Sequence, residues 1–292
     1  MARAELPLIG AGGEPVDFWR TVNSHGLNFL PPASIDDEAR TIELTLHPGP
    51  RTVVVREASP GVAVVSGRPT RAVVDAVAHV FRLDDDLSPF YSAIADDPDL
   101  AWAAAGAGRM MRAPTVFEDV VKTICTTNCA WSGTVRMVTA LVENLGDASD
   151  RGKRAFPTPR AMADAPESFY RDVARAGYRG AYLRAVATGV ASGELDLESL
   201  ATDRGLPDEE VEQRLLALPG VGPYAAAHVM MLIGRYTPLI LDSWTRPTYA
   251  RIAARKATDA TIARRFRRYG PYAGLAFWLY LTRGWVADDR PF

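Results

Sequence analysis

The sequence has few cysteines, no long apolar run and no excess of positive charge, and each absence excludes a class of protein. Its 292 residues include two cysteines, Cys125 and Cys129. Their spacing fits no zinc or disulfide framework, and the four thiolates of an iron–sulfur cluster are not available. No apolar stretch approaches the ~20 residues of a membrane span, and the N-terminus lacks a signal-peptide core. We therefore expect a cytoplasmic protein with no membrane partner and no iron–sulfur cluster.

The charge is balanced overall but unevenly distributed. Lys and Arg number 33 against 35 Asp and Glu, which gives a net charge of -2. Bases gather near the C-terminus, where Asp259 is the one acid among them. Such a stretch either meets a phosphate backbone or forms a solvated helix face, and the sequence leaves both open. The bases are Arg251, Arg255, Lys256, Arg264, Arg265, Arg267 and Arg268.

The hydrophobic pattern changes along the chain from strands to helices. Residues 40–46 alternate polar and apolar, and residues 51–56 and 61–66 are β-branched runs between Pro and Gly turns. Residues 71–81 switch to a helical period, and helices follow from about residue 87. We predict an α+β protein with an N-terminal antiparallel β-sheet domain and a two-subdomain helical body.

The predicted division of the chain follows the same pattern. The β-rich domain covers residues 1–88 and the helical body covers 89–292. Within the body, a middle subdomain spans about 115–232, and the remainder combines 89–114 with 233–292. Two helix starts are marked by a cap with Glu three residues later: Thr115 before Glu118, and Asp164 before Glu167.

A glycine hairpin over residues 216–224 is the most informative local motif. Gly220 and Gly222 allow positive φ and close approach of another backbone, and Pro223 suits the first position of a helix. The free N–H groups of that first turn then form an anion site, for which we name Pro219, Gly220, Val221, Gly222 and Tyr224. The alternative, without a functional role, is a structural turn between two packed helices. Backbone carbonyls offer a site for Na⁺ or K⁺, namely those of Leu216, Leu218 and Val221.

A single carboxylate, Asp242, follows the hairpin by eighteen residues, counted from Tyr224. It ends an apolar run, so we expect it at the edge of a cleft. It either caps the helix that begins next or stabilises positive charge on a bound sugar, and the two roles are compatible because a helix N-terminus keeps a carboxylate ionised.

These motifs together resemble the helix-hairpin-helix DNA glycosylase superfamily, which includes endonuclease III, 8-oxoguanine glycosylase and 3-methyladenine glycosylase II. The Leu-Pro-Gly-Val-Gly run at 218–222 and Asp242 carry the resemblance. Residues 123–128, 156–159, 177–182 and 276–285 are similar to segments of the latter two enzymes, so the resemblance covers most of the chain.

The resemblance implies a chemistry for the two key residues. Asp242 matches the catalytic acid of the superfamily, and Tyr224 stands where bifunctional members carry a Schiff-base lysine. Lys122 and Lys256 lie outside the motif. A monofunctional enzyme that uses water follows, with no required cofactor. The implied partner is double-stranded DNA containing a damaged base, bound by a monomer that is nucleoid-associated if the source is bacterial.

The resemblance also assigns a base pocket and a wedge. By position, a flipped base would contact Tyr224, His228, Trp244, Ala276 and Tyr280. For each aromatic taken alone, and for His228, packing in a helical core is the competing interpretation.

Asn128 and Tyr178 match residues that fill the gap left in the duplex, and Arg179 matches one that holds the orphaned base. Gly133 stands where 8-oxoguanine glycosylase has a second arginine for the opposite cytosine, and Arg136 lies about one turn on. For Asn128, Tyr178 and Arg179 the alternative is an ordinary loop or helix-end role.

The predicted function is hydrolysis of the N-glycosidic bond of a damaged purine in duplex DNA. Alkylated purines are cationic and leave easily, so an aromatic pocket of Tyr224, Trp244 and Tyr280 favours them over neutral oxidised purines, which need more specific hydrogen bonds. Two alternatives stay open: an 8-oxoguanine-type glycosylase without lyase activity, and a non-catalytic binder of damaged or branched DNA.

Overall fold

The computed structural model describes residues 2–47 and 49–286, and an antiparallel sheet forms the N-terminal part. Its five strands follow the order β1-β5-β4-β3-β2. The three strands predicted from the sequence are present, and two short edge strands were missed. The strands are β1 (Arg3–Pro7), β2 (Ser34–Asp36), β3 (Thr41–Leu46), β4 (Arg51–Ser59) and β5 (Val62–Ser66).

One face of the sheet is covered by a helix, α2 (Arg71–Val80). Val53 and Val55 of β4 are fully buried against apolar side chains of α2, such as Val77. The side chain of Thr70 accepts a hydrogen bond from Val73 N and fixes where the helix begins. The period-2 and period-3.6 patterns therefore meet in one core, as the sequence predicted.

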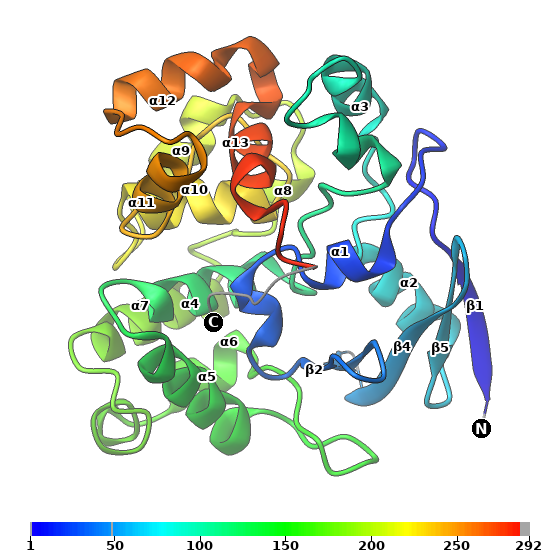
Figure 1. The fold of residues 1–292 in the computed structure, drawn as a ribbon. Coiled ribbons are helices and arrows are strands. Elements are labelled where there is room, and N and C mark those ends of the chain that lie inside the picture. Colours follow the sequence, from blue (N-terminus) through cyan, green and yellow to red (C-terminus); the bar gives the residue numbers. More distant parts are fainter. Residues whose placement is uncertain (1, 48, 287–292) are drawn as a thin grey trace.

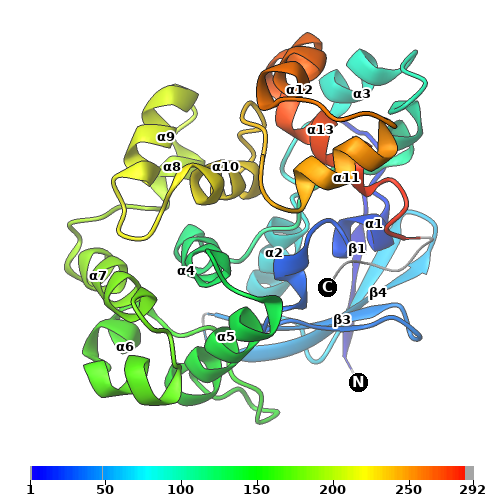
Figure 2. The same cartoon turned by 60° about the vertical axis from the view of Figure 1, so that its left-hand side comes forward.

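The remaining chain folds into helices in two groups (Figures 1 and 2). The first group and its connections are α4 (Val116–Thr126), α5 (Trp131–Leu145), α6 (Pro159–Asp164), the π-helix η3 (Phe169–Val173), α7 (Arg179–Ser192), α8 (Ser199–Thr202), α9 (Asp208–Leu216) and α10 (Pro223–Leu232). The second consists of α3 (Ser88–Ile94), η2 (Ala101–Ala105), α11 (Thr245–Ile252), α12 (Asp259–Phe266), η4 (Arg267–Tyr272) and α13 (Ala273–Thr282). The predicted α+β class is confirmed.

Helix α10 lies between the two groups. Ala226 and Val229 pack in the first buried cluster, whereas Ala227 and Met231 pack in the second. All residues from 225 to 232 are buried, as expected for a helix that is apolar on every side. The hairpin that opens α10 therefore lies at the junction of the groups. The predicted domain boundaries stay a prediction, and their outermost residues, 1 and 287–292, lie outside the described part.

The N-terminal segment also contacts both helical groups, through α1 (Phe18–Val22) and the 3-10 turn η1 (Gly26–Phe29). Leu27 and Leu30 join the buried cluster of the first group, and the indole N–H of Trp278 in α13 donates to the carbonyl of Ser24 at 2.8 Å. The sequence pattern did not predict this segment's path.

The two predicted helix starts had different outcomes. Glu118 N donates to the Thr115 side chain at 3.2 Å, as predicted, although the Glu118 carboxylate pairs with Lys122 and does not return to the cap. The Asp164 prediction is wrong. Asp164 is the last residue of α6 and pairs with Arg160 one turn earlier, at 2.6 Å. An i,i+4 ion pair explains its placement better than a cap does.

Candidate active site

An open cleft of about 640 Å³ lies where the hairpin faces α4 and α7. Its lining comes from the α4–α5 turn, the start of α7, the hairpin, the first turn of α10 and the segment before α11. Six of the predicted site residues line it: Asn128, Tyr178, Gly220, Gly222, Tyr224 and Asp242.

The two hairpin glycines are required for different reasons. Gly220 has φ of 82°, and a Cβ there would meet Tyr182 Cδ2 at 2.7 Å, so the fold itself demands glycine. Gly222 has φ of -103°, which any residue adopts, and no atom of the protein lies within 4 Å of its added Cβ. Open space in front of Gly222 at the N-terminus of α10 suits close approach of a phosphate.

The hairpin carbonyls suit the proposed monovalent cation in part. The carbonyl of Leu218 accepts a hydrogen bond from Val221 N at 3.2 Å, which leaves it one lone pair. The carbonyls of Leu216 and Val221 accept no hydrogen bond from the described residues. Oxygen donors of this kind fit a hard cation, and the cation stays a prediction.

Asp242 caps the helix that follows it and still borders the cleft. One carboxylate oxygen, Oδ1, accepts from Trp244 N at 2.8 Å and from Thr245 N at 2.7 Å. The Thr245 hydroxyl accepts in return from Asp242 N at 2.8 Å. Oδ2 has no hydrogen-bond partner among the described residues. The carboxylate is thus held in one orientation by one oxygen while the other is available to a ligand.

Tyr224 lies across the first turn of α10 and keeps its proton. Its hydroxyl lies 3.3 Å from the Thr126 hydroxyl of α4. Burial raises the pKa of the Tyr224 phenol, and the Asp242 carboxylate adds to this, whereas the hydrogen bond with Thr126 opposes it. Because a neutral phenol is a poor nucleophile, Tyr224 is suited to contact a base or sugar and not to attack one.

None of the chain's three lysines takes the place of the missing nucleophile. The ammonium of Lys122 is buried and pairs with Glu118 at 2.7 Å. Lys153 pairs with Glu43 on the sheet, at 3.2 Å, and Lys256 is exposed beyond α11. None of them lines the cleft.

His228 lies one turn below Tyr224 and is almost completely enclosed. Its ring packs against Tyr224 at 5.8 Å, Trp278 at 6.3 Å and His25 at 6.0 Å, all between centroids. Burial lowers the pKa of His228 to about 4, although the Asp242 carboxylate acts in the opposite direction. The imidazole is therefore neutral at physiological pH.

The other predicted pocket residues lie behind the cleft in the second buried cluster. Trp244 is half-buried and packs on Trp278 at 5.7 Å. Ala276 is fully buried, and Tyr280 is 8% exposed beneath the Arg265 guanidinium. None of the three lines the cleft. Core packing accounts for their burial, and their contact with a base stays a prediction.

The predicted wedge residues occupy the opposite wall. Asn128 is exposed at the α4–α5 turn with φ of 45°, a conformation that Asn tolerates better than most residues. Tyr178 is 55% exposed at the start of α7. Arg179 is buried, and its guanidinium donates to the carbonyls of Thr127 at 2.9 Å and Asn128 at 2.8 Å. Arg179 thus supports the Asn128 turn, and its contact with an orphaned base stays a prediction.

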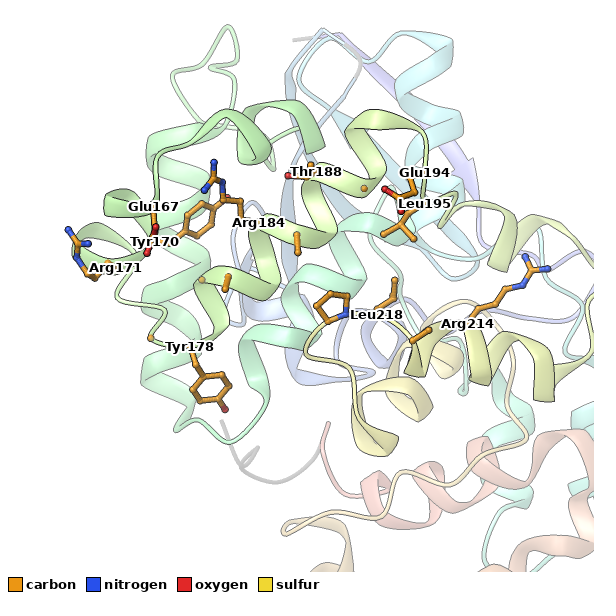
Figure 3. A pocket seen from close by; sticks show the side chains of 17 residues that line it. Glu167, Tyr170, Arg171, Tyr178, Arg184, Thr188, Glu194, Leu195, Arg214 and Leu218 are labelled. Atoms are coloured by element: carbon orange, nitrogen blue, oxygen red, sulfur yellow. The ribbon is translucent and has the colours of Figure 1, made fainter.

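A larger hollow of about 1050 Å³ lies on the other side of Tyr178, between α7 and α9 (Figure 3). Figure 3 shows Tyr178 at one end and Glu194 and Arg214 at the other. Leu218 and Pro219 of the hairpin form part of its wall. Its charges are mixed and its floor is built largely from small residues of α7, so it offers no defined chemistry.

Sequence reasoning missed residues both in the cleft and beneath it. Thr126 and Tyr182 line the cleft, and His25 and Trp278 enclose His228 from below. Tyr182 follows Tyr178 by four residues, a spacing that puts both on one helix face. No comparable signal exists for His25, because its position depends on the path of the N-terminal segment.

Comparisons with known proteins point in one direction. A scan against protein-family models finds no match. The DNA-3-methyladenine glycosylase of Bacillus subtilis is 27% identical over 169 residues, which cover 56% of this chain and 55% of that protein. The alignment therefore spans about half the length of this curated relative.

Solved structures match the fold over nearly the whole chain. The 8-oxoguanine glycosylase/lyase of Clostridium acetobutylicum matches with a TM-score of 0.74 at 20% identity, over 92% of this chain and 94% of that one. The 3-methyladenine DNA-glycosylase of Archaeoglobus fulgidus matches with a TM-score of 0.74 at 20% identity, over 98% and 99% of the two chains. The chain therefore has the fold of these DNA glycosylases, and over 169 residues it is similar in sequence to one relative.

Proposed function

We propose that the chain is a monofunctional DNA glycosylase of base excision repair, which hydrolyses the N-glycosidic bond of an alkylated purine in duplex DNA. The observation that carries this proposal is the cleft that holds Asp242 and Tyr224 beside the hairpin. A phosphate at Gly222 would bring the adjoining sugar within reach of the free carboxylate oxygen.

Asp242 supplies the electrostatics of the reaction. Cleavage of the glycosidic bond builds positive charge on C1′ and O4′ of the sugar, and a fixed carboxylate in a partly dry cleft stabilises that charge better than water does. The same oxygen, Oδ2, accepts a proton from the attacking water. Since the helix N-terminus holds Oδ1, little reorganisation is needed during the reaction.

The residue at position 224 supports hydrolysis without lyase chemistry. A Schiff base needs a neutral amine near C1′, and the cleft presents the phenol of Tyr224. The product would be an abasic site on an otherwise intact strand.

Neutral, aromatic surroundings support a cationic base as the substrate. Tyr224 and the neutral His228 lie beside Asp242, with Trp244 and Trp278 behind them. Polarisable rings attract a cationic purine, and no protonated imidazole repels it. The relative from Bacillus subtilis is named for 3-methyladenine, which agrees with this choice.

Double-stranded DNA is the proposed partner, bound by a monomer with no required cofactor. Na⁺ or K⁺ on the carbonyls of Leu216, Leu218 and Val221 would connect the hairpin to the phosphate.

A lesion panel tests the proposal. Duplexes that each contain one 7-methylguanine, 3-methyladenine or 8-oxoguanine are incubated with the protein and heated in alkali, with Asp242→Asn protein prepared in parallel as background. We expect cleavage at the alkylated bases. If 8-oxoguanine alone is excised, the substrate is an oxidised purine and not an alkylated one. If no lesion is cleaved above background, the protein is a non-catalytic binder of damaged DNA. A covalent adduct trapped by borohydride would contradict the monofunctional assignment.

A further inference from the structure

Four arginines at the end of α12 and the start of η4 differ in their partners. Arg265 and Arg268 point toward the preceding segment of the second helical group. Arg265 pairs with Asp99 at 2.8 Å, and Arg268 pairs with Asp97 at 2.5 Å. These two charges are neutralised within the fold and anchor α12.

The other two arginines of this stretch have no such compensation. Arg264 and Arg267 are exposed, and so are three bases in α11 and the turn after it, namely Arg251, Arg255 and Lys256. None of these five side chains forms an ion pair with a described residue. We call these five residues the basic face.

The one acid in this stretch does not reduce the charge of the basic face. Asp259 is held by Arg246, whose guanidinium donates to both carboxylate oxygens at 2.8 and 2.9 Å. Arg251, Arg255 and Lys256 are neighbours at the end of α11 and in the turn after it, so their like charges repel one another within a Debye length of about 10 Å. A polyanion would relieve that repulsion.

The basic face is connected directly to the cleft. Asp242 lines the cleft and caps α11, so this helix starts at the cleft. Arg251 lies six residues after Thr245, which is about 9 Å along the helix axis. That length corresponds to roughly three base pairs of duplex.

We propose that the basic face binds the phosphate backbone of duplex DNA several base pairs from the nucleotide in the cleft. The inference rests on the proposed function, because the cleft fixes where the duplex lies. The hairpin would hold the phosphate beside the reacting sugar, and the basic face would hold one arm of the duplex.

Salt dependence of binding tests this proposal directly. A triple variant, Arg251→Gln, Arg255→Gln and Lys256→Gln, is compared with a control triple in the N-terminal part, Arg3→Gln, Arg56→Gln and Arg68→Gln. The control residues are also exposed and without ion pairs among the described residues. Fluorescence anisotropy measures affinity for a duplex with a central abasic-site analogue at several salt concentrations.

We expect the triple variant to bind at least tenfold more weakly at low salt, and its slope of log K against log salt to fall by about 1–3, since each lost phosphate contact removes about 0.9. The control triple should match wild type. When the duplex arm that faces the basic face is cut to about two base pairs, wild type should lose as much affinity and slope as the triple substitution removes. The triple variant should lose no more.

Equal slopes for wild type and both triples would overturn the proposal and leave a solvated helix face. The outcome is separable from the proposed function. If the triple variant excises alkylated bases and keeps the wild-type slope, DNA binding by the basic face is refuted and the glycosylase activity is not. If the slope changes but the protein excises no lesion, only the glycosylase activity is refuted.

Discussion

The cleft and the buried cluster behind it both contain residues that the family resemblance marked for function, and they differ in what the fold requires of them. Asn128, Tyr178 and Gly222 are accessible at the cleft, and packing within the protein gives no reason for Gly222. Ala276 and Tyr280 are buried, and packing alone explains their presence. A residue that the fold does not need is the stronger functional candidate, and four predictions test how far this distinction holds.

The largest expected effect is on the buried side. Tyr280→Ala should lower the free energy of unfolding by about 3–5 kcal/mol, because it removes a buried ring together with one aromatic and one hydroxyl contact of Arg265. Thermal denaturation measures the loss. Tyr280→Phe keeps the ring and should excise bases normally. A Phe variant that is stable but inactive would show that Tyr280 contacts the base, and that a residue explained by packing also has a functional role.

The buried histidines predict a dependence of stability on pH. Burial lowers the pKa of His25 to about 3 and that of His228 to about 4. Between these values and about 6.5, the unfolded chain binds more protons than the folded one, so stability falls as pH falls. Asp119 acts in the opposite direction, because burial raises its pKa to about 7.

Replacing both histidines isolates their contribution to the pH dependence of stability. From pH 6.5 to 5, wild type should lose on the order of 2–4 kcal/mol more than His25→Gln/His228→Gln, since each pKa unit corresponds to about 1.4 kcal/mol per group. Urea unfolding at several pH values measures the difference. Parallel pH profiles for the two proteins would show that the imidazoles are not held neutral.

The two hairpin glycines should affect different properties of the protein: Gly220 its stability and Gly222 its binding of DNA. Gly220→Ala should destabilise the fold by about 1–2 kcal/mol, because its φ is positive and a Cβ meets Tyr182. Gly222→Ala should leave stability within about 0.5 kcal/mol and weaken DNA binding about tenfold, the loss of roughly one charge-assisted hydrogen bond. Melting temperature and DNA affinity are measured for both. Normal binding by Gly222→Ala would remove the phosphate site.

The smallest effect is expected at the exposed wedge. Tyr178→Ala should leave the melting temperature unchanged, since the ring is mostly in solvent, and should weaken binding to a lesion duplex by about 1 kcal/mol through lost stacking. Tyr182→Ala is the matched comparison on the same helix face. A loss at Tyr182 alone would show that the inserted aromatic is the other one.

Prediction from the sequence succeeded where a short stretch of residues determines the local structure or carries a functional motif. The three central strands, helix α2 and the Thr115 cap follow from alternation, helical period and a capping side chain. The hairpin and Asp242 lie in one cleft, as the combination of the two motifs predicted.

Prediction failed where placement depends on distant segments. Residues 17–30 pack against α13 and the first helical group, which brings His25 beside His228 across about two hundred residues of sequence. Asp164 looked like a cap because its spacing to Glu167 fits a capping box, yet an ion pair with Arg160 places it at a helix end. Whether Arg179 faces a base or a turn was equally beyond local sequence.

Single-turnover excision by Asp242→Asn separates a catalytic role of the carboxylate from its role as a helix cap. Asn caps helices about as well as Asp, so this change keeps the hydrogen bonds to Trp244 and Thr245 and removes only the charge. We expect an unchanged melting temperature and excision of 7-methylguanine slowed by about 100- to 1000-fold. An excision rate equal to that of wild type would show that Asp242 is a helix cap and not a catalytic residue.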